Sequence, residues 1–421
     1  MSLKYKKTIL DNGIRVISES SRDARSLALG FYVDVGSSLE PEDLSGVSHF
    51  IEHILFKGTR KRSAYQIANA LESVGGGLDA FAGREATAFV SRCLPEHLYR
   101  SVDVLSDMLC NPAMKPLAIE LEKSVIFEEI RSFDDTPEEV VHEHLSRSVW
   151  GSRSIASPIL GTLESVGSFR RDKVMSYFKS HYVPSRTIVA ATGKVDHNKL
   201  VEYVAKKLKI REKKNNIKSD DYPGALPRVF HDTRKVSQCY ICLGTEAPRY
   251  TDKNRFGAVI LSLLLGGGMT SRLFQEVREK LGLAYSVYCM CEFYRETGLF
   301  TIFLAVEPKK ARQAVGQVAR ELKRLKRNGL RKGELKSIKQ QLKGSMVLGL
   351  ESTSARMNRL ARQELYLDDY VPVEKTLKKL MNLREDAIEA AARSLFDPDK
   401  FSLVTVGPSG SGRPTKAALD F

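Results

Sequence analysis

The chain has 421 residues, of which 42% are hydrophobic and 28% are charged, so we expect a soluble protein of two or more domains with a well-packed core. The formal net charge of +15 suggests a nucleic-acid partner, but the basic residues are spread out and their densest cluster, residues 206–214, stands beside no nucleic-acid-binding motif. We interpret that cluster as a solvated linker face and expect neither nucleic acid nor a membrane as a partner, since the longest apolar stretch, residues 258–265, is far too short to cross a bilayer.

The first half of the chain alternates strand-like and helix-like segments. Residues 8–19 predict a β-hairpin, because two strand-like runs flank the turn sequence Asp-Asn-Gly at 11–13. Apolar and β-branched runs predict further strands at 27–36 and 86–93. Apolar residues at helical spacing and good helix formers predict helices at 45–56, 64–74, 95–108 and 116–131.

A polar stretch that contains Pro and Gly, residues 213–227, predicts a linker near the middle of the chain. The segments on its two sides follow the same order. Residues 94–109 and 306–325 each combine a strand end, a proline and an amphipathic helix, and a second helix then follows in each half. We therefore expect two homologous α+β domains, residues 1–214 and 221–421, rather than a doubly wound parallel sheet.

The string His49-Phe50-Ile51-Glu52-His53 lies within the helix expected at 45–56. Residues four apart on an α-helix lie about 40° apart around the axis and ~6 Å apart along it, so two imidazoles can bind one metal ion. Glu52 is one turn from His49 on the same side, within reach of a metal-bound water. A catalytic zinc ion lowers the pKa of bound water to roughly 7, and a neighbouring carboxylate can accept its proton. Such a site needs a third protein ligand and one open position.

This motif, within the stretch GVSHFIEHILFKGT, resembles the inverted-zincin motif of the pitrilysin and mitochondrial processing peptidase family. The resemblance implies one zinc ion per chain, bound by His49, His53 and a glutamate on a later helix. The matching segment is EKSVIFEEI, residues 122–130, in which Glu129 aligns with the ligand and follows His53 by 76 residues (129 − 53 = 76). Its neighbour Glu128 remains the alternative, and Glu122 matches a further family glutamate that supports the site.

Two more segments resemble substrate-binding parts of the family. Residues 266–285, GGGMTSRLFQEVREKLGLAY, place Arg278 and Tyr285 where the family has an arginine and a tyrosine that contact the substrate. An arginine can hold a substrate carbonyl, and a tyrosine can donate to the developing oxyanion. The stretch LDAFAGRE at 78–85 resembles the edge strand that binds substrate by strand addition, with Asp79, Ala80 and Phe81 as contact residues. The family commonly has Asn where this chain has Asp79.

Other possible sites have simpler interpretations. Cys239 and Cys242 form a C-x-x-C pair, but their strand-like run would point the two thiols to opposite faces, so we expect ordinary cysteines in a reducing compartment. His142 and His144 lie in an acidic helix, and we expect them on a solvated face. The acidic residues of 128–143 either decorate an exposed helix start or attract basic peptides, and we favour the first interpretation.

The resemblance implies a zinc-dependent endopeptidase that cleaves peptides or extended, unfolded segments, with Glu52 as general base. It implies two domains, each an antiparallel sheet backed by helices, that face each other around a chamber. Zinc belongs to the first domain, and the second is non-catalytic but contributes substrate contacts. The family also predicts a homodimer, or a heterodimer with a related subunit. The first eleven residues lack the apolar segment of a signal peptide, which favours a cytoplasmic location.

Two other classes of function remain open. Some relatives have lost catalysis and act in assembly, although the intact residues of the expected site argue against that role here. A basic nucleic-acid-binding protein is supported only by the net charge. Zinc content separates these alternatives from a peptidase.

Overall fold

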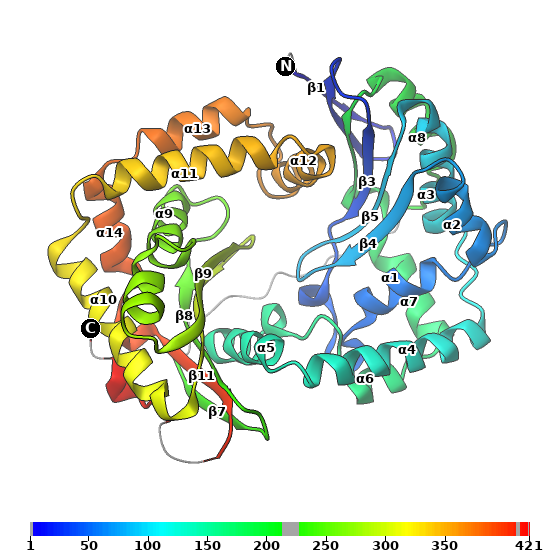
Figure 1. The fold of residues 1–421 in the computed structure, drawn as a ribbon. Coiled ribbons are helices and arrows are strands. Elements are labelled where there is room, and N and C mark those ends of the chain that lie inside the picture. Colours follow the sequence, from blue (N-terminus) through cyan, green and yellow to red (C-terminus); the bar gives the residue numbers. More distant parts are fainter. Residues whose placement is uncertain (1–2, 213–226, 410–412, 420) are drawn as a thin grey trace. The chain divides into compact units, whose positions relative to one another are not determined.

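Figure 1 shows a computed structural model of the chain, which describes residues 3–212, 227–409, 413–419 and 421. All but the last residue of the expected linker, 213–227, lie outside this described part. The chain forms two compact units, and neither is continuous in sequence. The first consists of Met1–Arg131, Ser157–Ser219 and Val347–Tyr370, and the second of Ser132–Ala156, Asp220–Met346 and Val371–Phe421.

The first unit contains a six-stranded sheet with the order β1-β2-β6-β3-β5-β4. β2 and β6 run parallel, and all other neighbours are antiparallel. The expected hairpin forms, with β1 and β2 paired from Leu3↔Ser21 to Ile9↔Arg15. The central strands β3 and β6 are buried along their whole length, as continuous runs of apolar and small residues predict. The strands are β1 (Leu3–Ile9), β2 (Arg15–Ser21), β3 (Leu27–Val33), β4 (Gly77–Ala82), β5 (Thr87–Cys93) and β6 (Thr187–Gly193).

Helices cover one face of this sheet and enclose a core that includes Phe31, Phe50, Phe89 and Phe169. The four helices expected in the first half form close to their predicted bounds. The α-helices here are α1 (Val47–Leu55), α2 (Ala64–Glu72), α3 (Leu98–Cys110), α4 (Pro116–Asp134), α6 (Leu163–Gly167), α7 (Arg171–His181) and α8 (His197–Lys207), with 3-10 turns at Ser37–Leu39, Glu42–Leu44, Pro95–His97 and Pro184–Arg186.

The second unit contains a five-stranded sheet with the order β7-β11-β8-β10-β9. β7 and β11 run parallel and the rest antiparallel, which reproduces the directions of β2-β6-β3-β5-β4 in the first sheet. The α+β fold with two homologous, helix-backed sheets is therefore confirmed, but each sheet includes one parallel pair that the sequence did not indicate. The strands are β7 (Val229–Thr233), β8 (Cys239–Ala247), β9 (Ala284–Phe293), β10 (Gly298–Val306) and β11 (Ser402–Gly407).

A second helical layer packs on the second sheet and encloses a separate apolar core. In the described part of the chain, no helix combines the length and the apolar character that a membrane span requires. The helices of this unit are α5 (Pro137–Trp150), α9 (Arg255–Gly266), α10 (Ala311–Asn328), α11 (Glu334–Gly349), α13 (Val373–Met381), α14 (Glu385–Leu395) and the π-helix η6 (Phe274–Lys280), with 3-10 turns at Ser154–Ala156, Pro308–Lys310, Pro398–Lys400 and Lys416–Leu419.

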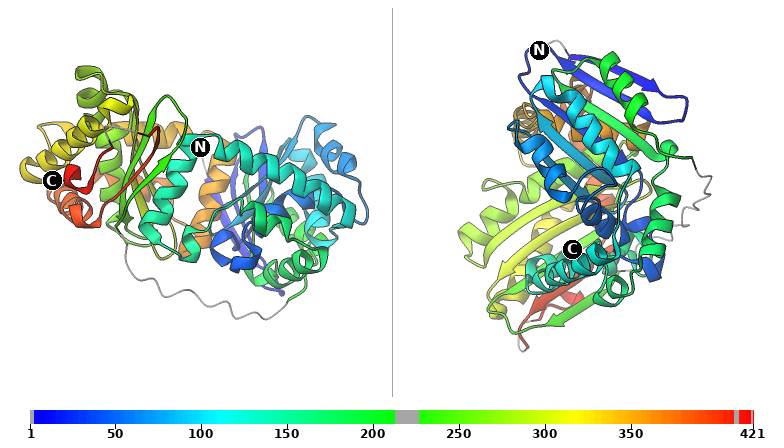
Figure 2. Two further views of the ribbon diagram at one scale, coloured as in Figure 1. Left: turned by 90° about the horizontal axis from the view of Figure 1, so that it is seen from below. Right: turned by 90° about the vertical axis from the view of Figure 1, so that its right-hand side faces the viewer.

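One helix of each sequence half packs with the other half. Helix α5 lies against β8 and β11 of the second sheet (Figure 1 and Figure 2), and buries Leu145 and Trp150 there. Helix α12 (Thr353–Leu367), from the second half, covers β3 and β6 of the first sheet. The compact units therefore differ from the contiguous stretches 1–214 and 221–421, because both faces of each sheet are apolar and the second face is covered by a helix from the other half.

The α12 contact combines apolar and polar interactions. Met357, Leu360 and Leu365 pack on small and apolar residues of the first sheet. The hydroxyl of Tyr32 donates to Asn358 at 2.5 Å, and Arg356 pairs with the buried Glu19 at 2.8 Å. The stability of the first unit thus depends on a segment that lies more than 130 residues beyond the middle of the chain (347 − 211 = 136).

We expect Met357→Ala to destabilise the first unit by about 2–5 kcal/mol, because Met357 is 1% exposed and the smaller side chain leaves a cavity. Hydrogen exchange measures this locally: the amides of β3 and β6 should exchange faster, while those of β8 and β10 keep their wild-type rates. The exposed Glu351→Ala, just before the same helix, is the control, with a change within about 0.5 kcal/mol. Equal loss of protection in both sheets would contradict the assignment of α12 to the first unit.

Candidate metal centre

Helix α1 is held at its start by a buried carboxylate. Glu40 accepts hydrogen bonds from the backbone N–H groups of Gly46 at 2.6 Å and Ser48 at 2.7 Å. Burial raises the pKa of Glu40 to about 7, although these hydrogen bonds oppose the shift. Gly46 has φ +88°, and a Cβ there would lie 2.6 Å from the carbonyl oxygen of Leu160. The loop and the glycine together fix where the helix begins.

The apolar residues of α1 fix its rotation. Phe50, Ile51 and Ile54 are buried, and the ring of Phe50 meets that of Phe169 edge to face with the centroids 5.2 Å apart. This packing leaves His49 and His53 together on one side of the helix, with their ring centroids 4.5 Å apart. The helical spacing of the motif therefore acts as the sequence predicts.

Glu129 of α4 reaches both imidazoles. Its Oε1 lies 3.6 Å from His49 Nε2, and its Oε2 lies 3.6 Å from His53 Nε2. One ligand atom from each of the three residues lies within 4.8 Å of the other two. The side chain of Glu128 instead turns outward, is 74% exposed and pairs with Arg131. Between the two alternatives that the sequence left open, the structure places Glu129 beside the histidines.

Glu122, two helical turns before Glu129, determines which nitrogen of His53 carries a proton. Its Oε1 lies 2.8 Å from His53 Nδ1, and its Oε2 lies 2.8 Å from Lys57 Nζ. Burial alone would raise the pKa of Glu122, but the hydrogen bonds from His53 and Lys57 outweigh it and lower the pKa. An ionised carboxylate can only accept, so Nδ1 of His53 donates and Nε2 keeps its lone pair.

The charges of this cluster fit a bound cation. Burial, together with the nearby His53, lowers the pKa of His49 to about 4, so its ring is neutral near pH 7. Burial also opposes a charge on His53, but its hydrogen bond to Glu122 raises the pKa. Nε2 of His49 and Nε2 of His53 each lie 3.6 Å from an oxygen of the Glu129 carboxylate. Two imidazoles and one carboxylate are a donor set that zinc uses in catalytic sites.

Glu52 links this cluster to the edge strand β4. Burial raises the pKa of Glu52, while the charge of His53 and a hydrogen bond from the backbone N–H of Ala82 oppose the shift. The N–H of Ala80, two residues earlier, donates to the side chain of Asp79 at 2.9 Å. Along β4 the exposed and half-buried residues alternate, and Phe81 is exposed. The strand thus offers a free edge beside the carboxylate of Glu52.

The other two predicted residues belong to the second unit. Arg278 lies in η6, and Tyr285 follows at the start of β9 with 74% of its surface exposed. The guanidinium carbon of Arg278 lies 4.8 Å from the ring centre of Phe274 and 5.6 Å from that of Tyr285. Among the described residues no carboxylate forms an ion pair with Arg278. Its charge is held by two rings and is free to meet a ligand.

The structure also places the cysteines of the C-x-x-C pair and the histidine of the acidic helix. Cys239 and Cys242 contribute to the cores on opposite faces of the second sheet, as expected, and neither forms a disulfide. The expectation of a solvated face for His142 is wrong: its ring stacks on Tyr288 and Phe303, and burial lowers its pKa. The cause is the exchange of α5, which brings this acidic helix onto the second sheet.

Sequence reasoning missed two residues that shape the centre. Lys57 lies four residues after His53, so helical spacing could have indicated it as a neighbour of the same carboxylate. Glu40 had no such signal, because glutamate is not a preferred residue at a helix start and it lies in a loop six to eight residues before the N–H groups that it accepts from.

Comparisons with known proteins agree with this geometry. The family model "Insulinase (Peptidase family M16)" matches residues 15–163, and "Peptidase M16 inactive domain" matches residues 168–342. The chain is 33% identical to the uncharacterized zinc protease YmxG of Bacillus subtilis over 96% of its own length and 99% of the relative. It is 35% identical to an uncharacterized zinc protease of Streptomyces coelicolor, over 96% and 89% of the two lengths.

Solved structures show the same fold. A crystal structure of a protease from Helicobacter pylori matches with a TM-score of 0.90 and 21% identity, over 96% of this chain and 100% of that one. A structure described as a peptidase M16 inactive domain from Pseudomonas fluorescens matches with a TM-score of 0.89 and 19% identity, over 98% and 100%. Together with the sequence matches along nearly the whole chain, they place this protein in peptidase family M16.

Proposed function

We propose that the protein is a zinc-dependent endopeptidase in which His49, His53 and Glu129 bind one zinc ion. The observation that carries the proposal is the meeting of three acceptor groups around one point, with the tautomer of His53 set by Glu122. Two imidazole nitrogens and a carboxylate at this spacing can bind a cation among them. The names of the relatives, which are zinc proteases, support zinc as that cation.

Glu52 is the general base of the proposed reaction. Bound zinc supplies a Lewis acid that lowers the pKa of a water molecule. The raised pKa of Glu52 suits it to accept a proton from that water near neutral pH and to pass it to the leaving amine. The accessible side of α1 and the half-buried position of Glu52 keep the carboxylate within reach of a substrate that lies along β4.

Strand β4 is the proposed docking edge for the substrate. An extended peptide can add to this edge through main-chain hydrogen bonds, which favours unfolded or flexible segments over folded proteins. The N–H of Ala80 is bonded to Asp79, so a substrate strand must displace that carboxylate to reach it. Phe81 offers an exposed apolar contact on the same strand. Asp79, Ala80 and Phe81 thus form the proposed contact surface.

Arg278 and Tyr285 complete the proposal as substrate contacts from the second unit, with Arg278 holding a carbonyl and Tyr285 donating to the oxyanion. Their exposure and the unpaired charge of Arg278 support this role. The family resemblance further supports pairing with a second copy of this chain or with a related subunit, and the expectation of a cytoplasmic location rests on the sequence alone. Light scattering of the purified chain tests the pairing.

We expect Glu52→Gln to lower peptide cleavage by about 10²–10⁴-fold, because the amide cannot accept the proton of the attacking water. Zinc content should stay that of the wild type, since Glu52 is not among the three ligands. The measurement is mass spectrometry of the products from a peptide library, with zinc measured on the same samples. Unchanged products and rates would show that Glu52 is not the base.

Glu129→Gln should reduce bound zinc from about one ion per chain to a small fraction, because it removes the only anionic ligand. Glu128→Gln is the matched control: it makes the same chemical change one position away, on a side chain that points outward, and should keep both zinc and activity. Atomic absorption after dialysis measures the metal. Loss of zinc in Glu128→Gln but not in Glu129→Gln would reverse the assignment, and a wild type without zinc would favour an assembly subunit.

Glu122→Gln should weaken zinc binding about 10–100-fold without abolishing it, because His53 loses the partner that orients its ring and fixes its tautomer. Titration with a competing chelator measures the affinity. The nearby Glu120→Gln, on an exposed carboxylate of the same helix, is the control. If the two variants bound zinc equally well, the role given to Glu122 would be wrong.

A further inference from the structure

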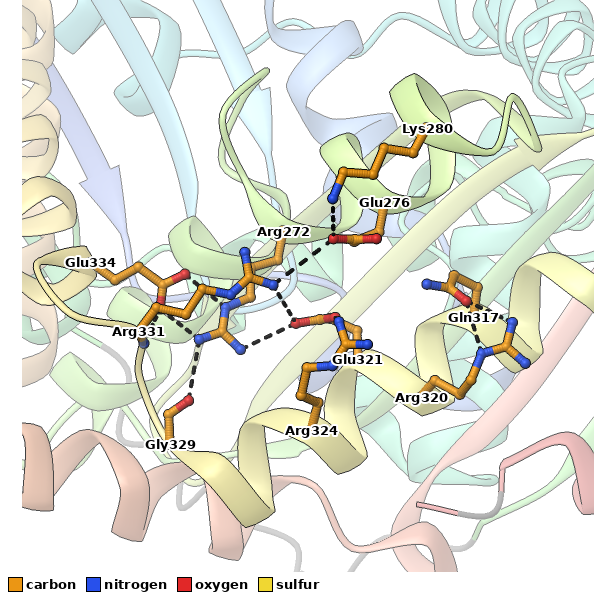
Figure 3. Close-up of polar contacts among 10 residues, drawn as sticks. All are labelled: Arg272, Glu276, Lys280, Gln317, Arg320, Glu321, Arg324, Gly329, Arg331 and Glu334. Atoms are coloured by element: carbon orange, nitrogen blue, oxygen red, sulfur yellow. Dashed lines mark hydrogen bonds and ion pairs between the residues drawn. The ribbon is translucent and has the colours of Figure 1, made fainter.

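A buried cluster of charges lies behind the segment that carries Arg278. The segment, residues 267–283, joins α9 to β9 and contains the π-helix η6. Figure 3 shows the cluster: Arg272, at the start of this segment, points at Glu321 of α10 and Glu334 of α11. π-helical turns are rare and occur often at functional sites, where they aim particular side chains. The segment therefore needs a feature that holds it in place.

Arg272 makes more polar contacts than any single ion pair would provide. Its Nε and Nη2 donate to the two carboxylate oxygens of Glu334 at 2.9 and 2.5 Å, its Nη1 donates to Glu321 at 3.2 Å, and its Nη2 also donates to the carbonyl of Gly329 at 3.2 Å. The side chains of Arg272 and Glu321 are 3% and 0% exposed. A two-pronged contact of this kind fixes direction as well as distance.

Further charged residues extend the cluster. Arg324 donates to Glu321 at 2.9 Å, and Arg331 lies 3.6 Å from the same carboxylate. Arg331 also lies 3.9 Å from Glu276, on the next turn of η6, which in turn pairs with Lys280 at 2.8 Å. Two points on the segment, Arg272 and Glu276, are thus tied to α10, α11 and the loop between them.

The ion pairs of Arg272 lie close in sequence to one of the two aromatic rings that contact Arg278. Phe274 follows Arg272 by two residues, and its ring is one of the two that flank the guanidinium of Arg278. Burying an arginine with two carboxylates costs desolvation energy and is weak as a source of stability, so a geometric role accounts better for it. A shift of the first turn of η6 would move Phe274 and, with it, Arg278.

We propose that Arg272 is a positioning residue for the substrate contacts Arg278 and Tyr285. Through Glu321 and Glu334 it holds η6 so that Phe274 and Tyr285 keep the guanidinium of Arg278 in place for a substrate carbonyl. The inference rests on the proposed function, because Arg272 has no chemical role of its own and matters only if Arg278 contacts the substrate. Arg272 contacts neither substrate nor metal in this scheme and acts only through Arg278.

The test is a double-mutant cycle in kcat/KM on one peptide substrate. Arg272→Lys keeps the charge but loses the two-pronged contact, and we expect it to lower kcat/KM on the order of 10–100-fold, as a displaced contact residue does. In an Arg278→Ala background the same change should cost no more than about twofold, the usual scatter of independent mutants. Equal losses in both backgrounds, or wild-type activity of Arg272→Lys, would overturn the proposal.

Arg320→Lys is the matched control. Arg320 is on the same helix as Glu321, but it donates to Gln317, outside the cluster (Figure 3), so kcat/KM should not change. If Arg272→Lys does not fold, Glu334→Gln takes its place in the same cycle, since it weakens the two-pronged contact with Arg272 and leaves Arg272 paired with Glu321. Circular dichroism and zinc content of every variant show that the fold and the metal centre are intact.

The cycle also separates this inference from the proposed function. If Arg278→Ala cleaves like the wild type while Glu52→Gln does not, the positioning role is overturned and the zinc peptidase assignment stands. If Glu52→Gln cleaves like the wild type, the proposed mechanism itself fails. If Arg278→Ala and Arg272→Lys each lower kcat/KM and the double variant is no worse than Arg278→Ala alone, both assignments hold.

Discussion

Two imidazole nitrogens and one carboxylate meet at a single point on the first unit, and the chemistry proposed for the chain depends on their all being acceptors. Glu122 supports this for His53, because its ionised carboxylate accepts the hydrogen bond from Nδ1–H, and Nε2 of the neutral ring then keeps its lone pair. Burial keeps the ring of His49 neutral, since it lowers the pKa to about 4. Other parts of the fold provide the means that hold these three groups together.

Those means are the packing of α1 and α4. The first helix is fixed at its start by Glu40 and along its length by Phe50 and its apolar neighbours. The second presents Glu122 and Glu129 two turns apart, so that one carboxylate orients a histidine and the other faces both. Most of the stabilisation is apolar burial beneath the helices, which leaves the polar residues free to be arranged for binding.

Residues whose roles depend on local spacing were predictable from the sequence, and residues whose roles depend on distant partners were not. His49, Glu52 and His53 follow from helical periodicity, and Glu129 was preferred only through a resemblance, since periodicity cannot choose between it and Glu128. An acidic helix with a solvated face was expected around His142 and His144 of α5, and no helix was predicted at α12. A helical pattern shows that a face is buried and not which sheet buries it. The exchange of these helices therefore could not be read from the sequence.

The duplicated topology lets corresponding segments of the two units be compared. In each unit two helical segments connect the strands that correspond to one another: α1 and α2 lie between β3 and β4, and α9 and η6 lie between β8 and β9. Helix α9 is mostly apolar, with Arg255 and Ser262 as its polar residues, whereas α1 carries His49 and His53, so the second copy has a core helix in place of one with the proposed metal ligands. η6 is a π-helix where α2 is a regular helix with a capping box. The regular helix α2 is stabilised by its own capping box, whereas η6 is held by the buried ion pairs of Arg272. This arrangement is expected when the position of the exposed Arg278 matters more than the stability of the helix that carries it.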